Sequence, residues 1–225
     1  MSRFNVPVCM SANAGYVDTA GFLALQGLFT AHVTGNFVTL GAALVQGSTG
    51  ALAKLLALPV FCLVIVAARL LAPVLPRMGL PILRTMLALQ CVLLLVGAVL
   101  AIELTPGHHG DDWQDVLTGM VLVAAMAIQN AASRIHLATA PPTTLMTGTT
   151  TQIMVDIADL IRGVSSKDTA AAKARLAKMT PNVAAFALGC GAAACLFSQF
   201  AAWCFVVAPV LAAIPVMMDA TKEQV

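Results

Sequence analysis

"FTAHVTGNFVTLG" (29–41) and "TTLMTGTTTQIMVD" (143–156) are two related stretches that interrupt otherwise apolar sequence. Each contains a Thr-Gly step, followed by Asn36 in the first stretch and by Thr149 in the second. Glycine weakens a helix, and Thr and Asn side chains compete with the helical backbone for its hydrogen bonds. The two stretches therefore predict two breaks in apolar helices, at matching places in the two halves of the chain.

Composition decides the class of protein. Hydrophobic residues make up 60% of the chain and charged residues 10%, with a mean hydropathy of +0.91, whereas soluble domains carry about a quarter charged residues. Several apolar stretches are long enough, alone or as closely joined pairs, for a bilayer that needs about 20 residues per helix: 51–75, 85–102, 116–133 and 183–218. We expect an all-α, polytopic membrane protein with a single membrane domain over 1–225. The formal charge of +2 gives no reason to expect a nucleic-acid partner.

The placement of charge predicts the topology, because Lys and Arg resist translocation. Cations cluster near Arg3, in the 77–84 turn and over 162–178, so these segments are expected on the cytoplasmic side. The segment 103–115 carries four acidic residues and no Lys or Arg, so we expect it outside. Both 103–115 and 162–180 are expected to be loops. Both termini are predicted to be cytoplasmic, with 219–225 as a tail.

The number of membrane crossings follows from these sides. Two segments, 30–47 and 143–162, begin and end on the same side, so each is predicted to be re-entrant: it enters the membrane and a half-helix leads back out. The remaining segments make six transmembrane helices: 5–28, 51–74, 85–102, 116–138, 181–199 and 202–218. The fifth is expected to start with Thr180 as its cap and Pro181 at its first position.

Six helices divide into two groups of three, repeat 1 over 5–102 and repeat 2 over 116–218. Each repeat has its re-entrant or broken helix after its first span. A three-span repeat must be inserted in opposite orientations, so we expect an inverted-topology duplication, as in secondary transporters.

The two tripeptides, Thr34-Gly35-Asn36 and Thr147-Gly148-Thr149, are expected at the starts of the half-helices. Non-helical backbone is tolerated at membrane depth only where it is shielded by protein or lines a polar cavity. Free N–H groups and positive dipole ends would then point toward the membrane midplane. Asn36 and Thr149 are also residue types that cap helix N-termini. The alternative is that Gly35 and Gly148 only permit close packing of helices.

Polar side chains inside the spans point to the same region. Asp18 lies near the middle of the first span, where a charge costs roughly 2.5–3.5 kcal/mol on insertion scales. We expect it to be protonated or paired and to carry a proton; the alternative is a structural hydrogen-bonding role. Asn13 and Tyr16 share its helix. Asn130 and Arg134 share one face of the mirror helix, and Arg134 either snorkels to the interface or pairs with Asp18 or an anionic substrate.

Three motifs in order along the chain resemble one family. They are "GYVDTAGFLALQGLFTAHVTGN" (15–36), "AIQNAASR" (127–134) and "LMTGTTTQ" (145–152). This pattern is similar to the YoaK-like family of bacterial inner-membrane proteins, which has a G-Y-x-D opening, an A-H-x-T-G-N motif and a Q-N-A…T-G-T second half. The resemblance implies a multi-pass protein of the inner membrane. It implies no substrate.

The function that these features favour is a secondary transporter or facilitator of a small anionic solute, proton-coupled through Asp18. A channel and a non-transporting scaffold or sensor remain alternatives. The predicted substrate-binding residues are Asn13, Tyr16, Asp18, Thr34, Gly35, Asn36, Asn130, Arg134, Thr147, Gly148 and Thr149. No H-E-x-x-H or G-x-S-x-G motif is present, and we expect no enzyme activity, cofactor or metal. The Gly-rich 188–195 would let two helices approach closely, within one chain or across a homodimer.

Overall fold

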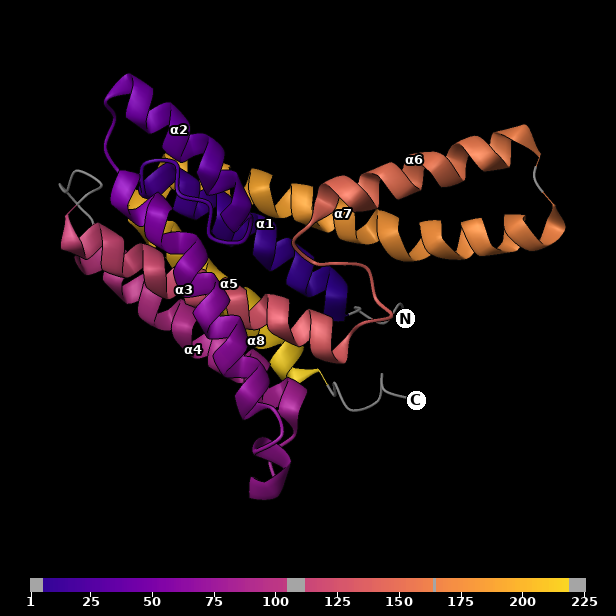
Figure 1. Cartoon of the computed structure of the whole chain (residues 1–225), viewed down its shortest axis with the longest axis horizontal. Helices are drawn as coiled ribbons and strands as arrows, with labels where there is room; N and C mark the ends of the chain where they lie inside the picture. Colours follow the sequence, from indigo (N-terminus) through magenta and orange to yellow (C-terminus); the bar gives the residue numbers. More distant parts are fainter. Residues whose placement is uncertain (1–5, 105–111, 164, 219–225) are drawn as a thin grey trace.

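The computed structural model describes residues 6–104, 112–163 and 165–218, and every regular element in them is helical (Figure 1). The α-helices are α1 (Val6–Ala24), α2 (Asn36–Gln46), α3 (Ala51–Leu71), α4 (Ile82–Glu103), α5 (Trp113–His136), α6 (Met146–Arg162), α7 (Ser166–Phe200) and α8 (Val207–Met217). Short 3₁₀ turns cover Val33–Gly35, Leu75–Met78 and Ala201–Val206. The all-helical expectation is confirmed.

Within the described residues, four helical segments are long and apolar enough to cross a membrane. They are α3, α4, α5 and the continuous stretch Ser166–Met217 that contains α7 and α8. Their outward side chains are largely apolar, including Leu63 and Leu70 on α3 and Val92 on α4, which are exposed. An exposed apolar face of this extent suits lipid rather than water. The helices therefore agree with a multi-pass membrane protein.

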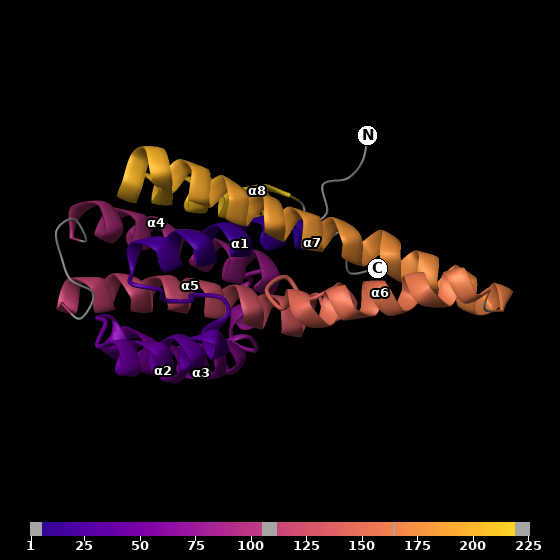
Figure 2. The ribbon, with the colours of Figure 1, turned by 90° about the horizontal axis from the view of Figure 1, so that it is seen from above.

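Helix α1 lies inside the bundle, between α7 on one side and α5 on the other (Figure 2). Its closest neighbour is α7, and two glycines permit this contact. A methyl group on Gly15 would overlap the carbonyl oxygen of Phe186, and one on Gly189 would overlap the carbonyl oxygen of Ala12. The two backbones therefore touch directly, as small residues allow in membrane bundles.

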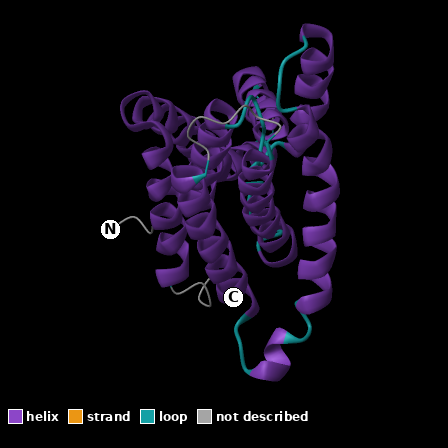
Figure 3. Ribbon diagram, turned by 90° about the vertical axis from the view of Figure 1, so that its left-hand side faces the viewer, coloured by secondary structure: helices purple, strands orange, loops and turns teal. Residues whose placement is uncertain are grey.

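Other helix pairs form both between the two halves of the chain and within each half. Helix α3 packs on α5, and α4 packs on both α5 and α8. Helix α2 lies on α3, and α6 lies on α7. Helices make up most of the described chain, and loops join them (Figure 3).

In each half, the chain folds back after the first helix before the next helix starts. Residues 25–35 return along α1 to the start of α2, and residues 137–145 return along α5 to the start of α6 (Figure 1). Gln26 and Gly27 make the first reversal with positive φ angles of 53° and 82°. The second reversal contains Pro141 and Pro142, which restrict the chain to extended backbone.

The loop predicted for 162–180 is wrong, because α7 is one helix of 35 residues that starts at Ser166. The side chain of Ser165 caps it by accepting a hydrogen bond from the Asp168 amide at 3.3 Å. Thr180 and Pro181 therefore lie inside the helix and do not begin it. The Ala- and Lys-rich sequence after Ser165 favours a helix whether or not it is charged, and the charges indicated solvent rather than a loop.

The length of α7 carries it past the rest of the bundle. A 35-residue helix is about 52 Å long, whereas the hydrocarbon core of a bilayer is about 30 Å thick. The charged first part of α7 and the neighbouring α6 form a hairpin that projects from the bundle (Figure 2). The segment 202–218 also differs from the expected uniform span, because a 3₁₀ turn over Ala201–Val206 precedes the 11-residue α8.

Candidate functional site

Asp18 anchors the first fold-back loop. Its Oδ1 atom accepts the amide N–H groups of Thr30 at 2.7 Å and Ala31 at 2.8 Å, and its Oδ2 atom lies 2.7 Å from Nδ1 of His32. The side chain of Asp18 is buried, whereas the His32 side chain is 30% exposed. Hydrogen bonds to a carboxylate are stronger than those between neutral groups. The conformation of residues 30–32 therefore depends on the Asp18 carboxylate.

Asn36 holds the other end of the same loop. Its side-chain oxygen accepts the amide N–H of Phe29 at 2.9 Å, and its amide nitrogen donates to the carbonyl oxygen of Phe29 at 2.8 Å. The expected N-cap role of Asn36 is wrong, because Gly35 is the cap residue of α2 and no side chain bonds to the cap. Gly35 packs against the ring of Phe29, where an added methyl group would lie 3.0 Å from the ring. A larger residue at this position would require the ring to shift by a few tenths of an ångström.

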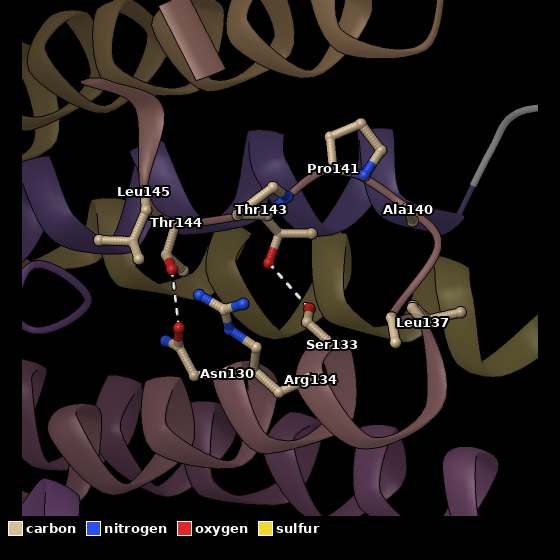
Figure 4. A pocket seen from close by; sticks show the side chains of 11 residues that line it. Asn130, Ser133, Arg134, Leu137, Ala140, Pro141, Thr143, Thr144 and Leu145 are labelled. Atoms are coloured by element: carbon tan, nitrogen blue, oxygen red, sulfur yellow. Dashed lines mark hydrogen bonds between the residues drawn. The ribbon is translucent and has the colours of Figure 1, made fainter. Parts of the chain in front are cut away.

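The second fold-back loop is tied to α5 by similar bonds. The hydroxyl of Thr144 donates to Oδ1 of Asn130 at 2.7 Å, and the hydroxyls of Ser133 and Thr143 are 3.1 Å apart (Figure 4). One helix turn away from Ser133, Gln129 donates to the carbonyl of Met10 at 2.9 Å. Asn130 thus ties the second fold-back loop to α5, as Asp18 ties the first fold-back loop to α1.

The second tripeptide does not break a helix. Thr147, Gly148 and Thr149 lie in the first turn of α6, which begins at Met146. The hydroxyl of Thr149 donates to the carbonyl of Leu145 at 3.2 Å, so the expected N-cap role of Thr149 is also wrong. No neighbour lies within 4 Å of a methyl group added to Gly148. The break precedes this tripeptide, in the loop that contains the two prolines.

Two cavities meet at the first loop. The larger, about 520 Å³, lies between α1, the first loop and α7, and Asp18, Phe22 and Phe186 line it. The second, about 330 Å³, lies between α3, α5 and the same loop. Its polar lining residues are His32, Thr34, Arg69, Asn130 and Arg134. His32 and Thr34 line both cavities, so these two residues stand where the cavities adjoin.

Two further cavities extend toward the projecting hairpin. A small one, about 90 Å³, shares Asn130, Arg134 and Leu145 with the second cavity and is closed by the proline loop (Figure 4). The next, about 320 Å³, lies on the other side of Pro141 and Pro142, and Arg175 and Lys178 of α7 line it. The lining residues therefore connect the hairpin to His32 through a series of adjoining cavities.

The comparisons with known proteins give a family and no activity. The chain matches, over residues 6–218, the family model described as "Protein of unknown function (DUF1275)". The chain belongs to the DUF1275 family. The YoaK-like resemblance of its motifs falls within this family. No curated protein and no solved structure matches the chain.

The cavities of this DUF1275 member bring together five of the residues predicted from the sequence: Asp18, Thr34, Gly35, Asn130 and Arg134. The other six line none of the cavities described above: Asn13, Tyr16, Asn36, Thr147, Gly148 and Thr149. Tyr16 is fully buried and donates its hydroxyl proton to the carbonyl of Cys204 at 2.7 Å, which gives it a packing role.

Sequence reasoning missed His32 and Arg69. His32 belongs to the A-H-x-T-G-N motif of the DUF1275 chain. The signal that could have identified it is an ionisable residue beside a helix break. Asp18 pairs with His32, and of the alternatives for Arg134, pairing with Asp18 is not found. Within the described residues, no group of three or more His, Cys, Asp and Glu side chains is arranged to hold a metal ion.

Proposed function

We propose that this protein is a secondary transporter or facilitator of a small anionic solute in the bacterial inner membrane. The observation that supports it best is the meeting of two cavities at His32 and Thr34, one cavity on each side of the first fold-back loop. A carrier needs a site that is reached from either side of the membrane in turn.

The pairing of the helices supports an inverted repeat. In this repeat α1–α4 are matched in order with α5–α8. The contact of α1 with α7 then corresponds to that of α5 with α3, and the contact of α2 with α3 to that of α6 with α7. The contact of α4 with α5 likewise corresponds to that of α8 with α1. This correspondence supports two copies of one unit, in which α1, α3, α4 and their counterparts make the six proposed crossings. Helix α2 is the proposed re-entrant helix, whereas its counterpart α6 projects from the bundle with the charged part of α7.

The two cavities correspond under the same matching. One lies between the first helix of the first repeat and α7, and the other between the first helix of the second repeat and α3. Asp18 and Phe22 line the first, and their counterparts Asn130 and Arg134, also four residues apart, line the second. Alternating access then opens each cavity in turn as one repeat rocks against the other.

Proton coupling is assigned to the Asp18–His32 pair rather than to Asp18 alone. Histidine is the side chain whose unperturbed pKa lies closest to neutral pH, so it exchanges protons readily. Because the Asp18 carboxylate also holds the amides of Thr30 and Ala31, a change of charge on the pair alters the loop that separates the two cavities. Binding of a proton is thereby linked to a change of shape.

Flux measurements with purified protein in proteoliposomes test this function. A thermal-shift screen first identifies solutes that raise the melting temperature, because a ligand that binds only the folded state stabilises it. We expect a hit to show saturable counterflow in wild-type vesicles and none with Asp18→Asn. Asp159→Asn, on α6 and outside the cavities, is the matched control and should transport normally. A solute that binds but never crosses the membrane contradicts transport and favours the sensor or scaffold function, whereas unsaturable flux favours the channel.

A further inference from the structure

Two arginines from different halves of the chain line the cavity of about 330 Å³. Arg69 lies near the end of α3 and Arg134 near the end of α5. Neither has a carboxylate partner within the described part of the chain, and both side chains are exposed. Two guanidinium groups that line one cavity favour an anion between them, so an anionic ligand would complete this pair.

The rest of the lining is mainly apolar. Phe61, Ile65 and Ile135 form much of it, together with Ala31, Val33, Ala131 and Leu145. Its other polar members, Thr34 and Asn130 among them, are few. Sites for small organic molecules have this character, with an apolar wall and a few polar groups that fix orientation. The volume also falls within their usual range of roughly 300–1,000 Å³.

We propose that this cavity binds an organic monocarboxylate, with the carboxylate between Arg69 and Arg134 and the apolar body against Phe61, Ile65 and Ile135. The guanidinium group matches a carboxylate with two parallel hydrogen bonds, which a point charge does not provide. An inorganic anion such as phosphate would lose its water on one face to apolar groups that return no hydrogen bonds. The inference rests on the proposed function, for which it names the solute class.

The cavities toward the hairpin support an anionic ligand independently. Lys178 lines the outermost cavity together with Arg175, whose charge is paired with Asp156, and Arg134 lines the small cavity that adjoins it across Pro141 and Pro142 (Figure 4). A row of cations raises the local concentration of anions and steers them inward. The row ends at the site between Arg134 and Arg69.

Binding of benzoate to the purified full-length protein in detergent tests the proposal. Titration calorimetry compares benzoate with neutral benzamide, which has the same ring, and with inorganic phosphate. We expect benzoate to bind at least tenfold more tightly than either, and Arg69→Gln and Arg134→Gln each to weaken it at least tenfold. Arg77→Gln, in the turn Leu75–Met78 away from the cavities, is the matched control and should bind as the wild type does.

The results that overturn the proposal are equally specific. Equal affinity for benzoate and benzamide would mean that the arginines only snorkel toward the interface. If phosphate bound as tightly as benzoate, the apolar wall of the cavity would not contribute to binding, which contradicts a site for an organic carboxylate. If a glutamine variant does not fold, the salt dependence of benzoate binding to the wild-type protein decides. The affinity for benzoate should fall as the NaCl concentration rises, since the attraction is ionic. An affinity that does not change with NaCl concentration contradicts the site.

Failure of this inference differs from failure of the transport function. Benzoate binding without counterflow leaves the carboxylate site in place and removes transport. The opposite result is counterflow of another solute by a protein that does not bind benzoate. If Arg69→Gln and Arg134→Gln are then as active as the wild type, transport stands and this site is contradicted.

Discussion

Nδ1 of His32 lies 2.7 Å from Oδ2 of Asp18, and the other oxygen of this carboxylate holds the backbone of residues 30 and 31. One buried group therefore joins a titratable imidazole to the shape of a loop. The loop is also the wall between the two largest cavities described above. In the proposed function, Asp18 therefore links the charge of the pair to the loop that separates the cavities.

Replacing Asp18 with Asn should loosen this loop. The amide keeps one acceptor oxygen but carries no charge, so the Thr30 and Ala31 amides no longer donate to a charged group, and such a bond is worth about 1.5–3 kcal/mol. We expect faster hydrogen exchange at the amides of Thr30 and Ala31 and a lower melting temperature. Asp159→Asn makes the same chemical change outside the cavities and should leave both unchanged. Exchange in Asp18→Asn as slow as in the wild type would show that the carboxylate does not hold the loop.

Asn36→Asp tests the second anchor of the loop with an isosteric change. The aspartate oxygen can still accept the Phe29 amide, but its second oxygen meets the Phe29 carbonyl, to which Asn36 donates. Two buried acceptors face to face cost about 1–3 kcal/mol. Chemical denaturation in detergent measures the loss in free energy of unfolding, with Thr149→Ser on α6 as a mild control. Equal stability of Asn36→Asp and the wild type would contradict the assigned bonds.

Two glycines on α7 should respond oppositely to the same substitution. Gly189→Ala places a methyl group on the carbonyl of Ala12 and forces α1 and α7 apart, whereas Gly191 has open space beside it. Overpacking of this kind costs about 1–3 kcal/mol or more, and Ala in place of Gly in a free helix position gains up to about 1 kcal/mol. The melting temperature should therefore fall for Gly189→Ala and stay the same or rise for Gly191→Ala. The same shift in both would mean that the helices are not in direct contact.

The ion pair between Asp156 and Arg175 should stabilise the projecting hairpin in a pH-dependent way. Arg175 donates from Nη2 to Oδ1 at 2.6 Å and from Nε to Oδ2 at 3.0 Å, and these bonds hold the pKa of the Asp156 carboxyl below its ordinary value of 3.8. A lowered pKa means that the stabilisation is complete above pH 3.8 and is lost as the pH falls through the lower, folded-state pKa. The melting temperature of the wild type should exceed that of Asp156→Asn at pH 7, and the difference should shrink below pH 3.8. A difference that is constant with pH would contradict the pair.

The sequence was enough to predict the class of fold and one anchor residue. Low charge and long apolar runs determine a helical membrane protein whatever its packing, and Asp18 stood out because a carboxylate inside an apolar span needs a partner. Composition alone did not identify that partner. His32 lies in the loop, 14 residues from Asp18 along the chain, and the reversal at Gln26 and Gly27 brings it to Asp18.

Two other predictions failed because the same residues serve more than one purpose. Thr147-Gly148-Thr149 resembles the first tripeptide, but the break in the helix lies earlier, in the loop that contains Pro141 and Pro142. Helix α6 therefore begins before the tripeptide. The charges of 166–180 led to the prediction of a loop, but charge does not oppose a helix that has good formers and a cap at Ser165. The cavity residues of α3 were missed because Arg69 lies near a helix end, where cations commonly snorkel.

The central claim is that two routes, one from each side of the membrane, reach the same place beside His32. Thr34 lines both cavities and is exposed, so a cysteine there reports on both routes. With the six native cysteines replaced, Thr34→Cys should be modified by a membrane-impermeant maleimide in vesicles of either orientation. Leu63→Cys, on the apolar exposed face of α3, should be modified in neither. Labelling of Thr34→Cys from one side only, or from neither, would contradict the account.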